Sequence, residues 1–289
     1  MKNNVDVSVI IPTYNRAQAL QRCINSLIGQ TLKNFDVFVC DDGSTDQTRS
    51  VVENYKNQLT INWLYCENFG GPARPRNIGM RASESKYIAF LDADDWWHPK
   101  KLEISIEELE KGHDFVYHDL IKYDESIDEI DKKVLMKTRV LQKPVYEDLL
   151  FHGNGITNSS VVVKRELMLK IDGFSENKLL IATEDYEAWL RLSKLNIEFL
   201  RLDNALGYYC TGNDNLSSPG KNLIYIKELI KIYFSQSRML YLSIPFWMNL
   251  TIASSHFYDK NYFSTFFHLF CGFLTNPYRT LKRILNRYK

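Results

Sequence analysis

The chain has 289 residues, of which 36 are Lys or Arg and 35 are Asp or Glu, so its formal net charge is +1. This balance gives no global attraction to polyanions, and we expect no nucleic-acid partner. Hydrophobic residues make up 45% and charged residues 25%, as in an ordinary soluble protein. The five cysteines are scattered and the first residues do not resemble a signal peptide, so we expect reduced thiols and a cytoplasmic location.

Strand-like and helix-like segments alternate up to about residue 110, which predicts an α/β fold with a mostly parallel sheet. Strands are expected over residues 7–11, 35–40, 61–66 and 87–91, and a helix follows the first strand, with apolar residues at helical spacing. Each strand ends in polar, turn-forming residues. Because right-handed crossovers bring the carboxyl ends of parallel strands to one edge, we expect the active site there.

The fourth strand-like segment runs into Asp92-Ala93-Asp94-Asp95. While the backbone stays extended, Asp92 and Asp94 point the same way and can share one divalent ion, with Asp95 facing elsewhere. Such hard oxygen ligands suit Mg²⁺ or Mn²⁺, and substrate phosphates usually complete the shell. An Asp-rich turn after a strand is the alternative interpretation.

Two helix starts are expected to be capped by hydroxyl side chains. In the segment 41–46, which follows the second strand, Ser44 or Thr45 is placed to cap the next helix. Thr183 is placed to cap a helix over residues 186–194, whose N-terminus also favours the acidic residues beside it.

Beyond residue 110 the alternation weakens. Residues 115–120 and 159–163 predict further strands. The charged stretch 123–137 predicts a solvated surface loop, with an active-site lid as the alternative.

Residues 216–289 predict a helical C-terminal region appended to a catalytic domain over residues 1–215. The helical patterns cover residues 224–234, 240–254 and 262–274 and are rich in Tyr, Phe and Leu. No acidic residue follows Asp259, whereas six basic residues do: Lys260, Arg279, Lys282, Arg283, Arg287 and Lys289. Such an end can rest on an anionic membrane surface, which would make the protein peripheral on the inner face of the cell membrane. Alternatively, a helical hairpin packs its apolar face on the catalytic domain and leaves a solvated basic tail.

Five motifs occur in a characteristic order. They are Pro12-Thr13-Tyr14-Asn15; Asp41-Asp42-Gly43-Ser44-Thr45-Asp46; Arg76-Asn77-Ile78-Gly79; Asp92-Ala93-Asp94-Asp95-Trp96-Trp97 with Pro99 and Lys101-Leu102; and Glu184-Asp185 with Trp189-Leu190-Arg191. In this order they resemble glycosyltransferase family 2 of the GT-A fold, over about residues 5–215. The resemblance implies a Rossmann-like, mostly parallel sheet flanked by helices, and an inverting, non-processive enzyme.

The resemblance also implies a set of residues around the nucleotide of the donor: Pro12, Thr13, Tyr14, Asn15, Asp41, Arg76, Asp92 and Ala93. Thr13 and Tyr14 would line the base, and Asp41 would accept the imide proton of uracil, for which a carboxylate is suited. The alternatives are a turn with a helix cap for Asp41 and a packing role for Tyr14.

The resemblance also implies roles for the charged group of Arg76 and for two further residues, Asp94 and Asp95. Arg76 would grip a diphosphate or a carboxylate, whereas its neighbour Arg74 is expected to be structural or solvated. Asp94 would bind Mg²⁺ or Mn²⁺, which neutralises charge on the departing nucleoside diphosphate. Asp95 would orient the loop or the acceptor.

Asp185 resembles the catalytic base of the family, which takes the proton from an acceptor hydroxyl as its oxygen attacks the anomeric carbon. Glu184 would raise the proton affinity of Asp185, although the two side chains point apart in a helix. Two acids in a first helical turn are the structural alternative.

One departure from the family pattern concerns a histidine that often follows an aromatic pair after this helix. Here residues 208–215 contain none, so either Asn213 or Asp214 substitutes or that ligand is absent.

Together these features predict transfer of a sugar, from a UDP-sugar in the first instance, to a hydroxyl of a glycan or lipid-linked glycan in bacterial surface polysaccharide or lipopolysaccharide assembly. A sugar nucleotidyltransferase is one alternative, although residues 12–15 lack the Gly-rich, basic loop it needs. A non-catalytic glycan-binding subunit of a polysaccharide assembly complex is another, which donor turnover would exclude.

Overall fold

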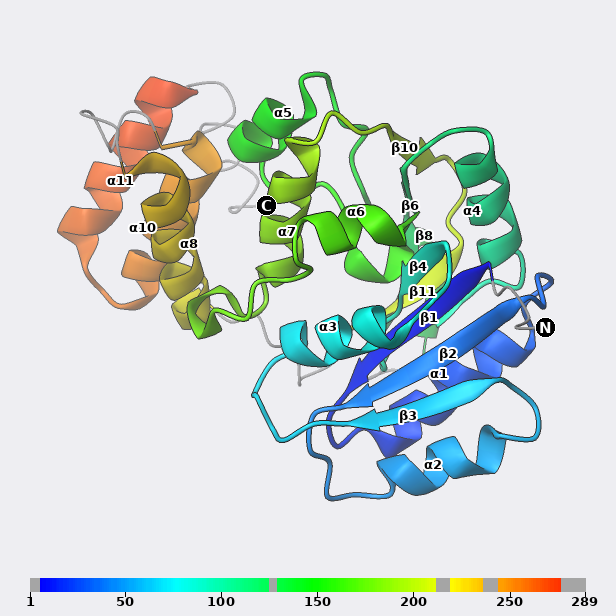
Figure 1. Ribbon diagram of the computed structural model, residues 1–289. Helices are drawn as coiled ribbons and strands as arrows, with labels where there is room; N and C mark the ends of the chain where they lie inside the picture. The colour runs from blue at the N-terminus through cyan, green and yellow to red at the C-terminus, as the bar shows by residue number, and fades with distance from the viewer. Residues whose placement is uncertain (1–5, 125–128, 212–218, 236–243, 277–289) are drawn as a thin grey trace.

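The computed structural model describes residues 6–124, 129–211, 219–235 and 244–276 (Figure 1). The strands are β1 (Val7–Thr13), β2 (Phe35–Asp41), β3 (Ile61–Tyr65), β4 (Tyr87–Phe90), β5 (Trp96–Trp97), β6 (Phe115–His118), β7 (Leu120–Asp124), β8 (Glu129–Met136), β9 (Val162–Lys164), β10 (Phe199–Leu202) and β11 (Gly207–Thr211). The helices are α1 (Ala17–Ile28), α2 (Thr48–Tyr55), α3 (Ala73–Ala82), α4 (Lys101–Glu110), α5 (Val145–His152), α6 (Arg165–Lys170), α7 (Glu184–Ser193), α8 (Pro219–Phe234), α10 (Phe246–Tyr258) and α11 (Tyr262–Thr275), with short 3₁₀ turns η1 (Asn158–Ser160) and η2 (Lys178–Leu180).

The main sheet has seven strands in the order β10-β6-β9-β4-β1-β2-β3. Strands β4, β1, β2 and β3 run parallel, and β9 is inserted antiparallel between β4 and β6. This arrangement confirms the predicted α/β fold with a mostly parallel sheet. A second sheet of four strands, β5-β11-β7-β8, lies beyond the end of β4 in the chain.

Side chains of successive strand residues enter two separate apolar layers, one on each face of the main sheet. In β1, Val9 and Ile11 pack with the buried face of α1, whereas Ile10 joins the layer under α3 and α7. The buried residues of α1 are Leu20, Cys23, Ile24 and Leu27, which recur at the helical spacing that the sequence predicted. The sheet is therefore covered by helices on both faces, as Figure 1 shows.

Helix α3 lies very close to the sheet because residue 79 is glycine. A Cβ atom there would stand 2.5 Å from the sulfur of Cys40 and 2.9 Å from Ile10 Cγ2. On the next face of α3, the Asn77 amide donates to the Phe174 carbonyl and accepts from the Phe174 N–H, both at 2.8 Å. The motif at residues 76–79 thus has a scaffold role that fixes α3 between the sheet and the segment before α7.

The prediction of a loop over residues 123–137 is wrong for the part of this segment that the structure describes. β7 and β8 pair antiparallel, with Leu120 opposite Met136 and Tyr123 opposite Ile130. β8 is the last strand of its sheet, where charged residues discourage further pairing, so its charges are compatible with a strand. The other two strand predictions shift: 115–120 divides into β6 and the start of β7, and 159–163 begins as a 3₁₀ turn before β9.

The predicted helix caps are also wrong. Neither Ser44 nor Thr45 caps α2; instead Asp46 Oδ1 accepts the N–H of Thr48 at 2.9 Å. The Thr183 side chain makes no capping bond to α7, because its hydroxyl donates to the Leu180 carbonyl at 3.0 Å. At α2 another side chain, Asp46, accepts the N–H at the helix start, and at α7 a backbone carbonyl binds the hydroxyl of the predicted cap.

The C-terminal helices pack on the catalytic part through α8 and α10. Ile226 and Leu229 of α8 and Met248 and Ile252 of α10 are buried in the same apolar layer as Trp189 of α7. We therefore propose that the chain divides near residue 215 into a catalytic part and a helical accessory part, and that the two parts pack together as one body. Of the helices in the described ranges, none is long and apolar enough to cross a membrane.

Candidate active site

The polar segments after β1, β2, β3 and β4 meet at one edge of the main sheet, as expected. Thr13 stands opposite Asp41 in the β1–β2 register. The Asp42 N–H donates to the Thr13 carbonyl and the Cys66 N–H to the Asp41 carbonyl, both at 2.9 Å. The first three loops are thereby linked backbone to backbone.

Asn15 connects the first loop to the second. Its N–H donates to Ser44 Oγ at 2.8 Å and its side-chain oxygen accepts the Thr45 N–H at 2.8 Å. Asn15 has a positive φ of 50°, a conformation that asparagine tolerates better than most residues. Pro12 and Thr13 are buried, and the Thr13 hydroxyl has no hydrogen-bond partner among the described residues. A buried hydroxyl at this edge is suited to a polar ligand atom.

Tyr14 and Asp41 differ in how accessible they are to the base of a nucleotide. The Tyr14 ring is 48% exposed at the mouth of this edge, where a planar base could stack on it. Asp41 is buried and its Oδ1 accepts the Ser44 N–H at 2.9 Å, so part of its carboxylate stabilises the turn. Asp42 has the purely structural role: its two oxygens accept from the N–H groups of Phe69 and Gly70 at 2.8 and 3.0 Å.

Arg76 is the central charged group of the site. Its guanidinium is buried, and it donates through NH1 to Glu184 Oε1 and through NH2 to Asp92 Oδ1, each at 2.6 Å. The two carboxylates raise the pKa of Arg76 further above its ordinary value, against the opposing effect of burial. Arg76 therefore ties the loop after β4 to the first turn of α7. Arg74, as expected, has a structural contact: it pairs with Glu176 at 2.9 Å.

The loop Asp92-Ala93-Asp94-Asp95 turns immediately instead of staying extended. The Asp95 N–H donates back to the Asp92 carbonyl at 3.0 Å, so the expectation of an extended backbone is wrong. The turn places Asp94 beside Arg16, whose NH1 donates to Asp94 Oδ2 at 3.0 Å, and buries Ala93. Asp95 is buried too, and its Oδ1 accepts the Cys210 N–H at 2.9 Å, which anchors the loop to β11.

Asp92 and Asp94 nevertheless remain electrostatic neighbours. Burial and then the negative charge of Asp92 raise the pKa of Asp94, against the effect of Arg16. A divalent cation would relieve this accumulation of carboxylates. Within the described residues, no three His, Cys, Asp or Glu side chains converge to hold a metal ion, and Asn213 and Asp214 lie outside the described ranges. The donor set fits a cation held by Asp94 together with the phosphates of a ligand.

Asp185 lies in the first turn of α7, with its carboxylate only partly exposed. Burial, followed by the charge of Glu184, raises the pKa of Asp185 to about 7, and Arg76 acts in the opposite direction. Glu184 points to Arg76, whereas Asp185 Oδ1 accepts its neighbour Tyr186's N–H at 2.6 Å, so the two acids point apart as expected. The negative charge of Asp92 also raises the pKa of Asp185, so the two motifs lie close enough to interact electrostatically.

Three residues of the site were missing from the sequence prediction. Arg16 pairs with Asp94, and the η1 turn supplies Asn158 and Ser159. Asn158 Nδ2 donates to Asp92 Oδ1 at 3.2 Å, and Ser159 Oγ accepts the Asp92 N–H at 3.1 Å. In the sequence, the polar run before β9 is the signal for Asn158 and Ser159, whereas Arg16 directly follows the first of the five motifs.

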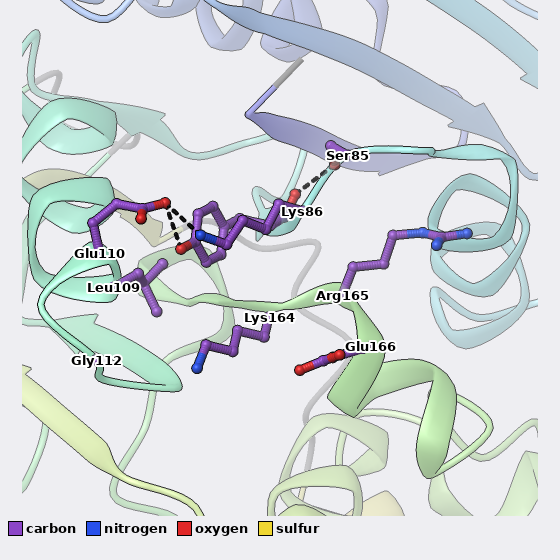
Figure 2. Close-up of a pocket in the computed structure, with 9 residues that line it drawn as sticks. Ser85, Lys86, Leu109, Glu110, Gly112, Lys164, Arg165 and Glu166 are labelled. Carbon is purple, nitrogen blue, oxygen red and sulfur yellow. Dashed lines mark hydrogen bonds and ion pairs between the residues drawn. The ribbon is translucent and has the colours of Figure 1, made fainter. Parts of the chain in front are cut away.

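A cavity of about 450 Å³ lies at the opposite end of β4 from the catalytic loop (Figure 2). It is lined by Ser85, Lys86, Tyr87, Leu109, Glu110, Gly112, Lys164, Arg165 and Glu166. The Lys86 ammonium donates to Glu110 at 2.7 Å and the Lys164 ammonium to Asp114 at 2.6 Å. Because these cations are neutralised within the chain and the donor-binding motifs lie elsewhere, this cavity is separate from the candidate active site.

Comparison with known protein sequences supports one family. The family model described as glycosyl transferase family 2 matches residues 8–166, more than half of the chain. The UDP-Glc:alpha-D-GlcNAc-diphosphoundecaprenol beta-1,3-glucosyltransferase WfgD of Escherichia coli is 34% identical over 193 residues, covering 66% of this chain and 70% of WfgD. A glycosyltransferase of Rickettsia conorii is 39% identical over 116 residues, 40% of this chain, but the match spans only 19% of that longer protein.

Solved structures of low sequence identity share the fold. The Staphylococcus aureus TarS fragment 1–349 in complex with UDP has a TM-score of 0.59 and 20% identity, covering 95% of this chain and 91% of that one. The mannosyltransferase PcManGT of Pyrobaculum calidifontis, in complex with GDP-Man and Mn²⁺, has a TM-score of 0.60 and 17% identity, covering 96% and 83%. These similarities agree with the predicted GT-A fold and glycosyltransferase class. The chain belongs to glycosyl transferase family 2.

Proposed function

We propose that this chain is an inverting, metal-dependent, non-processive glycosyltransferase. It moves a hexose from a UDP-sugar to a hydroxyl of a glycan acceptor, in assembly of a bacterial surface polysaccharide or lipopolysaccharide. The observation that carries the proposal is the Arg76 bridge, which joins the acidic loop at Asp92 to Glu184 and thereby sets Asp185 beside that loop. The names of WfgD and of the TarS complex favour UDP, and that of WfgD favours a lipid-linked acceptor.

The donor nucleotide would lie across the edge formed by the first two loops. Tyr14 offers an exposed ring for the base, the Thr13 hydroxyl a buried polar contact, and Asp41 an acceptor for the imide N–H. Pro12 and Asn15 hold the first loop in shape, with Asn15 tied to the second loop. Asp92 and Ala93 would lie on the ribose side, with Arg76 setting the position of Asp92.

Asp94 would hold Mg²⁺ or Mn²⁺ jointly with the donor diphosphate. When bound, such an ion stabilises negative charge on the departing nucleoside diphosphate. Arg16 now pairs with the Asp94 carboxylate, so it is placed to share the diphosphate charge at the same edge.

Asp185 would take the proton from the acceptor hydroxyl. A pKa of about 7 suits a general base near neutral pH, since a large fraction is ionised while the carboxylate still binds a proton well. Tyr186 holds the position: its hydroxyl donates to the Leu149 carbonyl at 2.8 Å, and Trp189, one turn on, is fully buried.

The substitution Asp185→Asn tests this assignment. It keeps the shape of the side chain but cannot accept the proton, so we expect transfer to fall by about 10²-fold or more. UDP affinity in the presence of Mn²⁺, measured by calorimetry, should change little. Asp172→Asn is the matched control, because its side chain is 90% exposed. Full turnover in Asp185→Asn would refute the role of Asp185.

A further inference from the structure

Helix α11 carries its apolar face outward. Six large apolar side chains along one face are 41–86% exposed: Phe263, Phe266, Phe267, Phe270, Phe273 and Leu274. Their spacing of three, four and seven residues places them in one stripe along a helix of 14 residues, which is about 21 Å long. Soluble proteins rarely expose a contiguous apolar surface of this kind without a partner for it.

The opposite face of α11 is the one that packs, and it is built from small and polar residues. Thr265, His268 and Gly272 are buried. His268 Nδ1 is hydrogen-bonded to the side-chain oxygen of the buried Asn249 of α10 at 2.9 Å. A Cβ atom added at Gly272 would lie 3.5 Å from the Cβ atom of Asn249, so the two helices are close here. Helices in lipid pack through small and polar residues in this way. The sequence-based alternative of a hairpin with its apolar face on the catalytic part is therefore wrong for α11.

We propose that the exposed face of α11 is a docking surface for an anionic lipid bilayer, with the helix lying in the plane of the interface. An amphipathic helix of this type buries its apolar face at the boundary between headgroups and acyl chains. Figure 1 shows α11 on the outer side of α10, away from the main sheet.

The charge of the C-terminal sequence favours a bilayer over a second copy of the chain as the partner of the exposed face of α11. α11 contains no Lys, Arg, Asp or Glu, and the sequence after Asp259 holds six basic residues and no acidic one. Basic residues that follow an apolar helix in the sequence complement the charge of anionic lipid, whereas a second copy of the chain would carry the same positive charge. Tyr258 and Tyr262, 63% and 55% exposed, stand at the end of α10 and the start of α11, and amphipathic rings of this kind suit the headgroup level.

Helix α10, on which α11 packs, contacts the residue next to the proposed base. Trp247 of α10 packs edge-on against Tyr186, with ring centroids 5.7 Å apart, and its indole N–H donates to the Leu150 carbonyl at 3.0 Å. Tyr186 directly follows Asp185. A docked α11 would thus hold Asp185 at a fixed height above the membrane, within reach of a lipid-linked acceptor. This last consequence rests on the proposed function, whereas bilayer binding does not.

Sedimentation with vesicles, without donor or acceptor, tests the docking surface. The full chain should bind vesicles of phosphatidylcholine with phosphatidylglycerol, and bind pure phosphatidylcholine more weakly. The double variant Phe266→Ser/Phe270→Ser should partition more than about tenfold more weakly, because two aromatic side chains no longer leave water. The matched control Val140→Ser/Leu169→Ser, also at exposed apolar positions, should bind like the unaltered chain.

A second variant reports insertion directly. Phe266→Trp/Phe270→Trp keeps the surface apolar, so it should bind at least as well and show tryptophan quenching by brominated lipids beyond that of the unaltered chain. Equal partitioning of Phe266→Ser/Phe270→Ser, or no binding by the unaltered chain, would overturn the proposal. So would concentration-dependent dimerisation that the serine variant abolishes without any effect of vesicles. Retained donor hydrolysis in the serine variant shows that it is folded and separates this test from that of Asp185.

Discussion

The catalytic edge and helix α11 both hold side chains in environments that are unusual for their type. At the catalytic edge, charged groups such as Arg76 and Glu184 are buried, and they are stabilised by partners from distant parts of the same chain. On α11, aromatic groups such as Phe263 and Phe266 are exposed, whereas the polar His268 is buried and hydrogen-bonded to Asn249 of α10. The buried charges of the first region are paired by side chains of the described residues, whereas the exposed rings of α11 would gain their partner from the bilayer that we propose. Substitutions should therefore destabilise the fold at the edge and leave it unchanged on α11.

The largest effect on folding is expected at Arg76. Arg76→Met keeps most of the side-chain volume but leaves the carboxylates of Asp92 and Glu184 without their buried cation, so unfolding free energy should fall by about 3–5 kcal/mol. Arg74→Met, on the same helix, removes a half-exposed ion pair and should cost less than about 1 kcal/mol. Denaturant unfolding measures both, and equal losses would show that Arg76 is not the centre of the network.

A medium effect is expected where α3 contacts the sheet. Gly79→Ala places a methyl group against Cys40 and Ile10, and the strain of overpacking should lower stability by about 1–3 kcal/mol. Gly29→Ala is the control, since its Cβ would meet only the Ser26 carbonyl, at 3.6 Å. Thermal unfolding of the two variants compares them; a neutral Gly79→Ala would mean that α3 can move away from the sheet without loss.

The smallest effect on folding is expected on α11. Each serine in Phe266→Ser/Phe270→Ser replaces an exposed ring, so the free energy of unfolding should change by no more than about 0.5 kcal/mol per site. Denaturant unfolding in the absence of lipid provides this measurement. A large loss would mean that the two rings stabilise the fold itself, and the contrast between the two regions would disappear.

The parts of the fold that depend on short-range pattern were predictable from the sequence. The strand segments around β1 to β4 and the buried face of α1 follow from local hydrophobic periodicity, and the common edge follows from crossover handedness. β8 was missed because a charged edge strand has no apolar alternation to detect.

The sequence motifs pointed to many of the residues that meet at the catalytic edge, but not to the contacts among them. The motifs contain Arg76, yet its partners Asp92 and Glu184 are 16 and 108 residues away, and only the folded chain selects among the carboxylates available. The turn after Asp92 and the contacts of Arg16 and Ser159 depend on the same long-range packing. On α11 the helical period was visible, but the sequence did not indicate that the face with His268, which is hydrogen-bonded to Asn249, is the buried one.

The pH dependence of kcat/KM for transfer tests most directly whether the charge network at the catalytic edge makes Asp185 a base. Because the carboxylate must be ionised to take a proton, the rate should be low at acid pH and rise with pH to a plateau, with its midpoint near the pKa of about 7. In Glu184→Gln the amide oxygen can still accept from Arg76 but the negative charge is gone, so the pKa of Asp185 and the midpoint should both fall. A midpoint that is the same in both proteins, or a rate that does not rise with pH, would contradict the account.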